Sequence, residues 1–307
     1  MPLVQVNVTG SQAVEVEDGA LGRALETAPK DAPVIICIHG YKFSPQVPAH
    51  TPHDHILALD PKRACRKAVS WPRALGFGGG DAAEGLCISL GWEARGSIWQ
   101  AYERAAQTGE ALARLIWKLD RPVHLIGHSL GARVALAALG HLHAGAVDRL
   151  VLLTAAEFRD KALAALDSEA GGAAEVINVT SRENDVYDWL FELALFKGDG
   201  DWRSLGSGLG TSRRNWVDVQ IDDVQTRAAL GRLGFSIPAA DRLICHWSPY
   251  LRKGVFDFYA SALRSPERLP MGLMQSLFER PHAPRWSRLL TPRLQPRSLP
   301  FRRNPTF

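Results

Sequence analysis

Short, largely apolar runs recur along the chain and are typical of strands buried on both faces of a parallel sheet. They lie at residues 33–38, 68–71, 123–126, 149–153 and 175–180. Residues 4–9 and 13–16 instead alternate between apolar and polar positions. Such alternation predicts strands with one solvated face, and we expect these two segments to form an antiparallel edge of the sheet.

Between these runs, hydrophobic residues return at the spacing of an amphipathic helix. The longest such segment is 97–119, and shorter helices are predicted near 19–28, 132–139, 162–166 and 186–196. Because strands and helices alternate, the pattern predicts an α/β fold with a doubly wound, mostly parallel sheet and helices on both faces.

Two stretches rich in glycine interrupt this pattern. Residues 76–81 read as a flexible loop. Residues 197–215 contain too much Gly and Ser for a core element. We expect this second stretch to form either a lid or loop near a pocket, or a solvated surface loop.

The C-terminal segment, residues 264–307, differs from the rest in charge and composition. It carries nine Arg, no Lys and two acids, a net charge of +7, so that residues 1–263 carry −3 of the total +4. Repeated prolines there disfavour further helices. We therefore divide the chain into a body at 1–263 and a tail at 264–307 that wraps the body or is partly disordered. Contact with the acidic body or solvation is favoured, contact with a membrane surface is left open, and no nucleic acid is expected.

Composition narrows the class of protein. With 46% hydrophobic and 22% charged residues the chain is globular. No apolar stretch is long enough to cross a membrane, and the N-terminus lacks the basic and apolar regions of a signal peptide, so we expect a cytoplasmic protein. The four cysteines form no C-x-x-C pair, which argues against zinc or redox chemistry through cysteine.

The segment Gly127–Gly131 reads Gly-His-Ser-Leu-Gly, directly after a predicted strand and before a predicted helix. A G-x-S-x-G sequence in this context is typical of a nucleophile elbow, in which a sharp turn exposes the serine hydroxyl. Gly127 and Gly131 leave room for the turn because they lack a Cβ atom. We therefore predict that Ser129 is a nucleophile and that the alternative, an ordinary helix cap, is less favoured.

A serine nucleophile needs a histidine as general base and a carboxylate that orients the histidine. The chain order in this class of site is serine, acid, histidine. His246 and His282 are the two histidines late enough, and His246, beside a short apolar run, is preferred over His282 in the tail. The predicted acid is Asp185, just after the run at 175–180. The other candidates are Glu157, Glu183 and Asp188, and Asp185 is also placed to cap the helix after it.

Backbone amides complete the predicted site. The tetrahedral intermediate of acyl transfer needs two N–H donors, and we expect these to be the amide of Leu130, after the nucleophile, and the amide of Tyr41, after the apolar run at 33–38. Gly40 would let the backbone approach the substrate, while His39 is expected to be a structural hydrogen-bonding residue.

With these residues the chain resembles the α/β-hydrolase superfamily, and in particular its serine esterases and lipase-like members. The motifs that carry the resemblance are Ile-His-Gly-Tyr at 38–41, Ser-Trp-Pro at 70–72, Gly-His-Ser-Leu-Gly at 127–131, Asp185 and His246. They span residues 33–260. The resemblance implies an acyl-enzyme mechanism that needs no cofactor.

The expected function is therefore hydrolysis of a carboxylic ester. A thioesterase, an amidase or a non-catalytic binding protein on the same scaffold remain alternatives. Tryptophans near the predicted site suggest an apolar acyl pocket, and they are Trp71, Trp92, Trp99, Trp189, Trp202 and Trp247. The cluster His50–His55, with three histidines and Asp54, is expected to border this pocket rather than to hold a metal ion.

Overall fold

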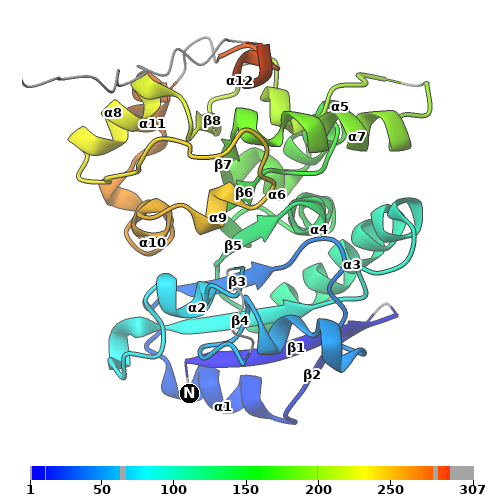
Figure 1. Cartoon of the computed structure of the whole chain (residues 1–307). Helices are drawn as coiled ribbons and strands as arrows, with labels where there is room; N and C mark the ends of the chain where they lie inside the picture. The colour runs from blue at the N-terminus through cyan, green and yellow to red at the C-terminus, as the bar shows by residue number, and fades with distance from the viewer. Residues whose placement is uncertain (1, 11, 63–66, 199, 279–282, 291–307) are drawn as a thin grey trace, which may run out of the picture.

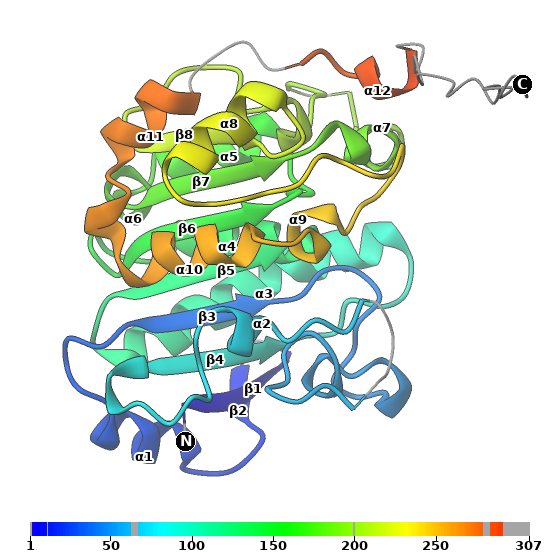
Figure 2. The same cartoon turned by 60° about the vertical axis from the view of Figure 1, so that its left-hand side comes forward.

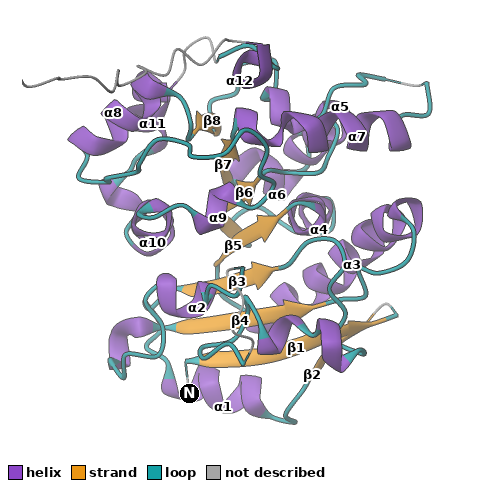
Figure 3. Cartoon of the chain, in the orientation of Figure 1, coloured by secondary structure: helices purple, strands orange, loops and turns teal. Residues whose placement is uncertain are grey.

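A computed structural model describes residues 2–10, 12–62, 67–198, 200–278 and 283–290. Its centre is one eight-stranded sheet with strand order β2-β1-β4-β3-β5-β6-β7-β8 (Figure 1, Figure 3). Neighbouring strands are parallel except β1 and β2. The strands are β1 (Leu3–Thr9), β2 (Gln12–Glu15), β3 (Val34–Ile38), β4 (Leu86–Gly91), β5 (Val123–His128), β6 (Val147–Leu153), β7 (Glu175–Thr180) and β8 (Trp216–Gln220).

Helices cover both faces of this sheet (Figure 2). One face packs on α1 (Ala20–Thr27), α3 (Ile98–Leu119), α4 (Leu130–Leu139), α5 (Arg159–Leu166), α6 (Glu169–Ala173) and α7 (Asp185–Leu195). The other packs on α2 (Trp71–Ala74), α8 (Val224–Arg232), α9 (Ser248–Leu251), α10 (Val255–Arg264) and α11 (Met271–Phe278). The doubly wound α/β fold predicted from the sequence is confirmed.

The continuous apolar runs follow directly from this double cover. Successive side chains of a strand point to opposite faces. In β3, Ile36 and Ile38 join the core of one face, whereas Ile35 and Cys37 join the core of the other. Each residue of such a strand is therefore buried, and no polar alternation remains.

The predicted strand at 68–71 is wrong. Ser70 caps α2 by accepting a hydrogen bond from the amide of Arg73 at 3.2 Å, and Trp71 begins that helix with a fully buried side chain. The strand in this part of the sheet is β4, which begins after Gly85. Gly85 has a φ of 75°, and a Cβ atom there would clash with the carbonyl oxygen of Pro33. Strand β8 was also missed, since its run is short and interrupted by Asp218.

The Gly- and Ser-rich stretch at 197–215 is neither a lid nor a solvated loop in its central part. Ser204 and Leu205 are fully buried, and the short 3-10 helix η5 (Leu205–Ser207) lies at the end of β7. The amide of Leu205 donates to the carbonyl of Glu157 at 2.9 Å. Gly206 has a physical role, because a Cβ atom there would clash with the carboxylate of Asp188.

The C-terminal segment lies against the body where it is described. Helix α10 crosses the predicted boundary at 263/264, and α11 shows that the prolines of this segment do not prevent a helix. Met271, Met274 and Phe278 of α11 are buried in the core. Residues 283–290, with α12 (Ser287–Leu290), lie above β8 and the start of α7 (Figure 1). Residues 279–282 and 291–307 lie outside the described part.

No helix in the described part of the chain is long and apolar enough to span a membrane.

Candidate active site

Ser129 occupies a strained turn between β5 and α4. Its backbone angles are φ 56° and ψ −123°, a region that residues other than glycine rarely adopt. A Cβ atom on Gly127 would lie 2.5 Å from the carbonyl oxygen of Gly131, and one on Gly131 would lie 2.6 Å from the carbonyl oxygen of His39. Both glycines are therefore required by the close approach of backbone to backbone. The turn holds the Ser129 side chain at the N-terminus of α4, where the helix dipole favours negative charge.

The loop after β3 approaches this turn closely. A Cβ atom on Gly40 would lie 2.8 Å from the Cβ of Ser129, so a side chain at this position would displace Ser129. Tyr41 is held in place by its hydroxyl, which donates to the carbonyl of Gly96 at 2.7 Å. Leu130 is the first residue of α4, so its N–H has no carbonyl one turn earlier in the helix to bind. Tyr41 and Leu130 both line the same cavity as Ser129.

His39 links this loop to Trp92 through two hydrogen bonds. Its Nε2 accepts from the amide of Trp92 at 3.0 Å, and its carbonyl accepts from the Trp92 indole at the same distance. Burial lowers the pKa of His39 to about 3. The ring is therefore neutral at physiological pH and structural, the role expected from the sequence.

His246 lies in the loop before α9, and not after a strand as its short apolar run suggested. Its carbonyl accepts from Nε2 of His128 at 3.1 Å and from the hydroxyl of Thr154 at 3.3 Å. The preceding residue, Cys245, donates its amide to the carbonyl of Glu183 at 2.8 Å. The loop is thereby fastened to the ends of β5, β6 and β7, where the other predicted residues lie.

The hydrogen-bond partner of the His246 ring is Asn184. Nδ1 of His246 lies 2.6 Å from Oδ1 of Asn184, and the amide nitrogen of Asn184 donates to Oδ1 of Asp188 at 2.8 Å. An ionised Asp188 can only accept, so in that state the NH2 group of Asn184 faces Asp188 and its oxygen faces His246. Nδ1 of His246 must then carry a proton, which leaves Nε2 as an acceptor.

No carboxylate contributes to this hydrogen bond, so no adjacent negative charge raises the pKa of His246. Burial lowers the pKa of His246 well below the usual value, and the neighbouring His128 and Lys67 lower it further. The ring is therefore neutral over the whole physiological range, as a general base must be before it accepts a proton.

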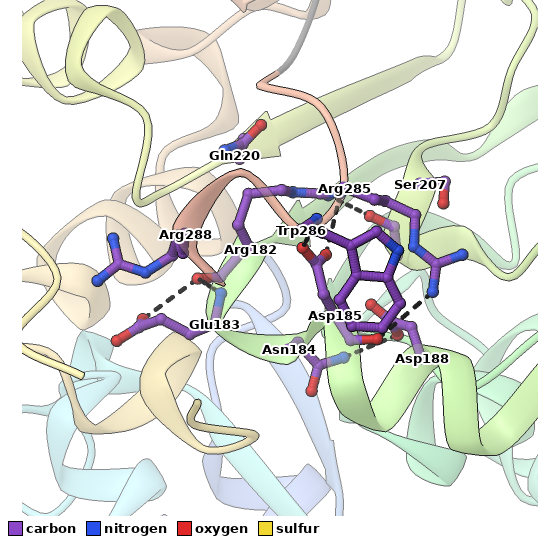
Figure 4. A network of polar contacts seen from close by, with 12 residues as sticks. Arg182, Glu183, Asn184, Asp185, Asp188, Ser207, Gln220, Arg285, Trp286 and Arg288 are labelled. Carbon is purple, nitrogen blue, oxygen red and sulfur yellow. Dashed lines mark hydrogen bonds and ion pairs between the residues drawn. The ribbon is translucent and has the colours of Figure 1, made fainter. Parts of the chain in front are cut away.

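The structure does not bring Asp185 to His246, which corrects the predicted acid. Oδ2 of Asp185 accepts from the amide of Trp286 at 2.7 Å, and Oδ1 lies 3.2 Å from the guanidinium of Arg182. Asp185 is the first residue of α7, whereas Asn184 ends the 3-10 helix η4 (Arg182–Asn184). A helical residue is rotated by about 100° from the one before it. Asn184 therefore contacts His246, whereas Asp185 points toward Trp286 of the C-terminal segment (Figure 4).

The alternative acids are engaged elsewhere. Glu183 forms a buried ion pair with Arg252. Glu157 forms one with Arg133 and accepts from the hydroxyl of Tyr102 at 2.7 Å. Asp188 reaches His246 only through Asn184. His282, the alternative base, lies outside the described residues.

The sequence does not single out Asn184, because the residue expected to orient a general-base histidine is a carboxylate. Asn184 lies between Glu183 and Asp185, and Asp188 follows close by. No local sequence pattern indicates which of these four side chains faces His246.

Ser129, Asn184 and His246 open into one cavity of about 620 Å³. Most of its lining is apolar, and the side chains concerned are Phe43, Ile98, Leu190, Phe191, Ala194, Trp247 and Tyr250. Of the six tryptophans named above, Trp247 lines the cavity. Trp71 and Trp92 are fully buried, and Trp99, Trp189 and Trp202 are exposed.

The cluster His50–His55 lies beside this cavity. His50 and His55 line a smaller space of about 200 Å³ that shares Tyr41 and Phe43 with it. Nε2 of His53 lies 2.7 Å from Oδ1 of Asn7, and Asp54 pairs with Lys62. Within the described ranges, no three His, Cys, Asp or Glu side chains form a group that could hold a metal ion.

The strained serine turn directly follows β5, at the carboxyl end of a strand in a mostly parallel sheet. The class of the protein is thus a doubly wound α/β fold with a strained serine turn. A family model described as a protein of unknown function, DUF726, matches residues 93–197, about a third of the chain and the part that contains the serine turn.

Two solved structures overlap this chain in part. The carboxylesterase CesB from Bacillus subtilis has 14% identity and a TM-score of 0.29, over 52% of this chain and 69% of that one. A protein described as a cell surface hydrolase from Lactobacillus plantarum has 15% identity and a TM-score of 0.36, over 63% of this chain and 82% of that one. A search among curated proteins found no match.

Proposed function

We propose that this chain is a serine hydrolase that cleaves a carboxylic ester, with Ser129 as nucleophile, His246 as general base and Asn184 as the residue that orients His246. The observation that supports this most is the 2.6 Å contact between Nδ1 of His246 and Oδ1 of Asn184. It defines the tautomer whose Nε2 can take a proton, in a cavity that also contains the strained Ser129.

In the proposed reaction, Oγ of Ser129 attacks the ester carbonyl carbon while its proton moves to Nε2 of His246. The amides of Leu130 and Tyr41 receive the oxyanion. When the intermediate collapses, Nε2–H of His246 protonates the leaving alcohol. A water then attacks the acyl-enzyme with His246 as base, and the acid product and free Ser129 are released.

Asn184 affects which bond such a site can cleave. A carboxylate stabilises the imidazolium that forms in the transition state, whereas a neutral amide stabilises it less. The amine leaving group of an amide substrate depends most on protonation by that imidazolium, because an amine anion is a much poorer leaving group than an alkoxide or a thiolate. The site therefore favours esters and thioesters over amides, and kinetics on matched oxygen, sulfur and nitrogen substrates would separate the three. The apolar lining favours an apolar acyl group.

The test is labelling with a fluorophosphonate, which reacts with activated serines. Wild type is compared with Ser129→Ala and His246→Ala, and the matched controls are Ser276→Ala and His143→Ala, which change exposed residues of the same types. We expect labelling of the wild type and both controls, and none of Ser129→Ala or His246→Ala. If the folded wild type is not labelled, or is labelled at another serine, the proposal fails and a non-catalytic binding protein becomes the better interpretation.

A further inference from the structure

The acidic side chains of helix α7 face the protein interior. The side chains of Asp185, Asp188 and Glu192 are 1–4% exposed, whereas Trp189 is 46% and Leu193 is 68% exposed. A helix on the surface of a soluble protein normally shows the opposite arrangement. Three buried carboxylates repel one another and lose hydration, so they require cations or hydrogen bonds from neighbouring elements.

Arg182 and Arg285 provide these cations (Figure 4). Arg182 comes from η4, next to α7, and Arg285 comes from the C-terminal segment. The two Arg285 contacts with Glu192 measure 2.8 and 3.1 Å, and its second nitrogen donates to the carbonyl of Asp185 at 3.4 Å. Trp286, the next residue, has a φ of 66° and directs its amide at the Asp185 carboxylate.

This network ends at the residue that orients His246. Asp188 accepts from the Asn184 amide, and the Asn184 oxygen faces His246. The charged groups around Asp188 are Arg182 from η4, Asp185 and Glu192 from α7, and Arg285. Burial raises the pKa of Asp188 to about 7, Arg182 and Arg285 act in the opposite direction, and Asp185 and Glu192 raise it further. An ionised Asp188 can only accept, so it holds the amide of Asn184 in one orientation, while a protonated one permits the reverse.

We propose that Arg285 is a positioning residue for the proposed hydrolase, and that the C-terminal segment thereby forms part of the site. Arg285 neutralises the buried acidic face of α7, keeps Asp188 an acceptor and so keeps Asn184 turned toward His246. This inference rests on the proposed function. It assigns a role to a segment that otherwise contains no residue of the cavity among those described.

The experiment measures the rate of fluorophosphonate labelling against pH in the full chain. The variants are Arg285→Gln, Arg285→Lys and the double variant Arg285→Gln/Glu192→Gln, and the control is Arg268→Gln, an exposed arginine of the same segment. We expect Arg285→Gln to label roughly tenfold more slowly near neutral pH, with its acid limb moved to higher pH. Lys, which keeps the charge but not the two-pronged contact, should recover part of the rate.

The double variant distinguishes charge from packing. It removes one buried acid together with its cation, so we expect it to label within about threefold of the wild type. A merely structural role for Arg285 would leave the pH profile in place and would make the double variant no better than the single one. An unchanged pH profile in Arg285→Gln overturns the inference, and so does a double variant that is labelled no faster than Arg285→Gln. If Arg285→Gln fails to fold, the labelling rates and pH profiles of Arg285→Lys and of the double variant test the inference in its place.

A second readout separates this inference from the proposed function. The ¹⁵N NMR signals of the His246 imidazole report the protonated nitrogen and its hydrogen bond, and they need no catalysis. We expect Arg285→Gln to change them in the same direction as Asn184→Ala. A wild type that is not labelled, yet shows this change, refutes the hydrolase and keeps the positioning. A wild type that is labelled, with signals unchanged in Arg285→Gln, keeps the hydrolase and refutes the positioning.

Discussion

The serine turn and the acidic turn of this site are built in opposite ways. The serine turn at Gly127–Gly131 is made from five consecutive residues whose small size and backbone angles determine its shape. The acidic turn at Arg182–Asp188 is held by partners from distant parts of the chain, Arg252 and Arg285 among them. The first turn can be read from its own sequence, while the second takes its geometry from residues brought there by the fold.

The difference explains why the geometry of the first turn could be predicted from its sequence, whereas the directions of the side chains in the second could not. At the serine turn, a Cβ atom on Gly127 or Gly131 would clash with backbone atoms, which cannot move aside as a flexible side chain can. At the acidic turn, Asn184, Asp185 and Asp188 are all polar and all compatible with a helix start. Which of them faces His246 depends on where η4 ends and α7 begins, and on the arginines that pair with the carboxylates of Asp185 and Glu192.

The largest expected effect is on the serine turn. In Gly131→Ala the new Cβ would lie 2.6 Å from the carbonyl oxygen of His39. We expect a loss of about 3 kcal/mol in the free energy of unfolding and no fluorophosphonate labelling, measured by denaturant melts and gel fluorescence. The matched control is Gly231→Ala on α8, where a Cβ meets nothing within 4 Å. Equal stability of the two variants would contradict a sterically determined turn.

The second prediction compares Asn184 with Asp185. Asn184→Ala removes the partner of His246, and we expect labelling to slow by about a hundredfold or more. Asp185→Asn keeps an oxygen that can accept from Trp286, and we expect its rate to stay within about threefold of the wild type. If Asp185 were the acid of the site, the order of the two variants would be reversed.

The smallest effect sharpens the assignment of Asn184 through pH. Labelling requires neutral His246, whose pKa is held well below the usual value by burial, His128 and Lys67. In Asn184→Asp the new carboxylate favours the imidazolium, which raises the pKa of His246. Since the active form is the neutral one, the acid limb of the labelling rate should move to higher pH. An unchanged limb would show that residue 184 does not face the base.

The sequence by itself determined strands β3, β5, β6 and β7, the long helix α3 and the shape of the serine turn. β7 has the predicted bounds at 175–180, and the helix predicted at 97–119 is α3. These elements are specified by local patterns, because burial on both faces requires a continuous apolar run and a sharp turn requires glycine. The local pattern also predicts a strand at 68–71, and this is wrong because Ser70 is the N-cap of helix α2.

Only the tertiary structure decided the direction of the side chains at the acidic turn and the place of the C-terminal arginines. Arg285 is a hundred residues from Asp185 in the chain, yet it contacts the Asp185 carbonyl. Charge and polarity can be counted in a sequence, but the pairing of buried charges depends on which elements meet. That is why the shape of the turn at Ser129 could be predicted from its own residues, whereas the contact between Asn184 and His246 is seen only in the fold.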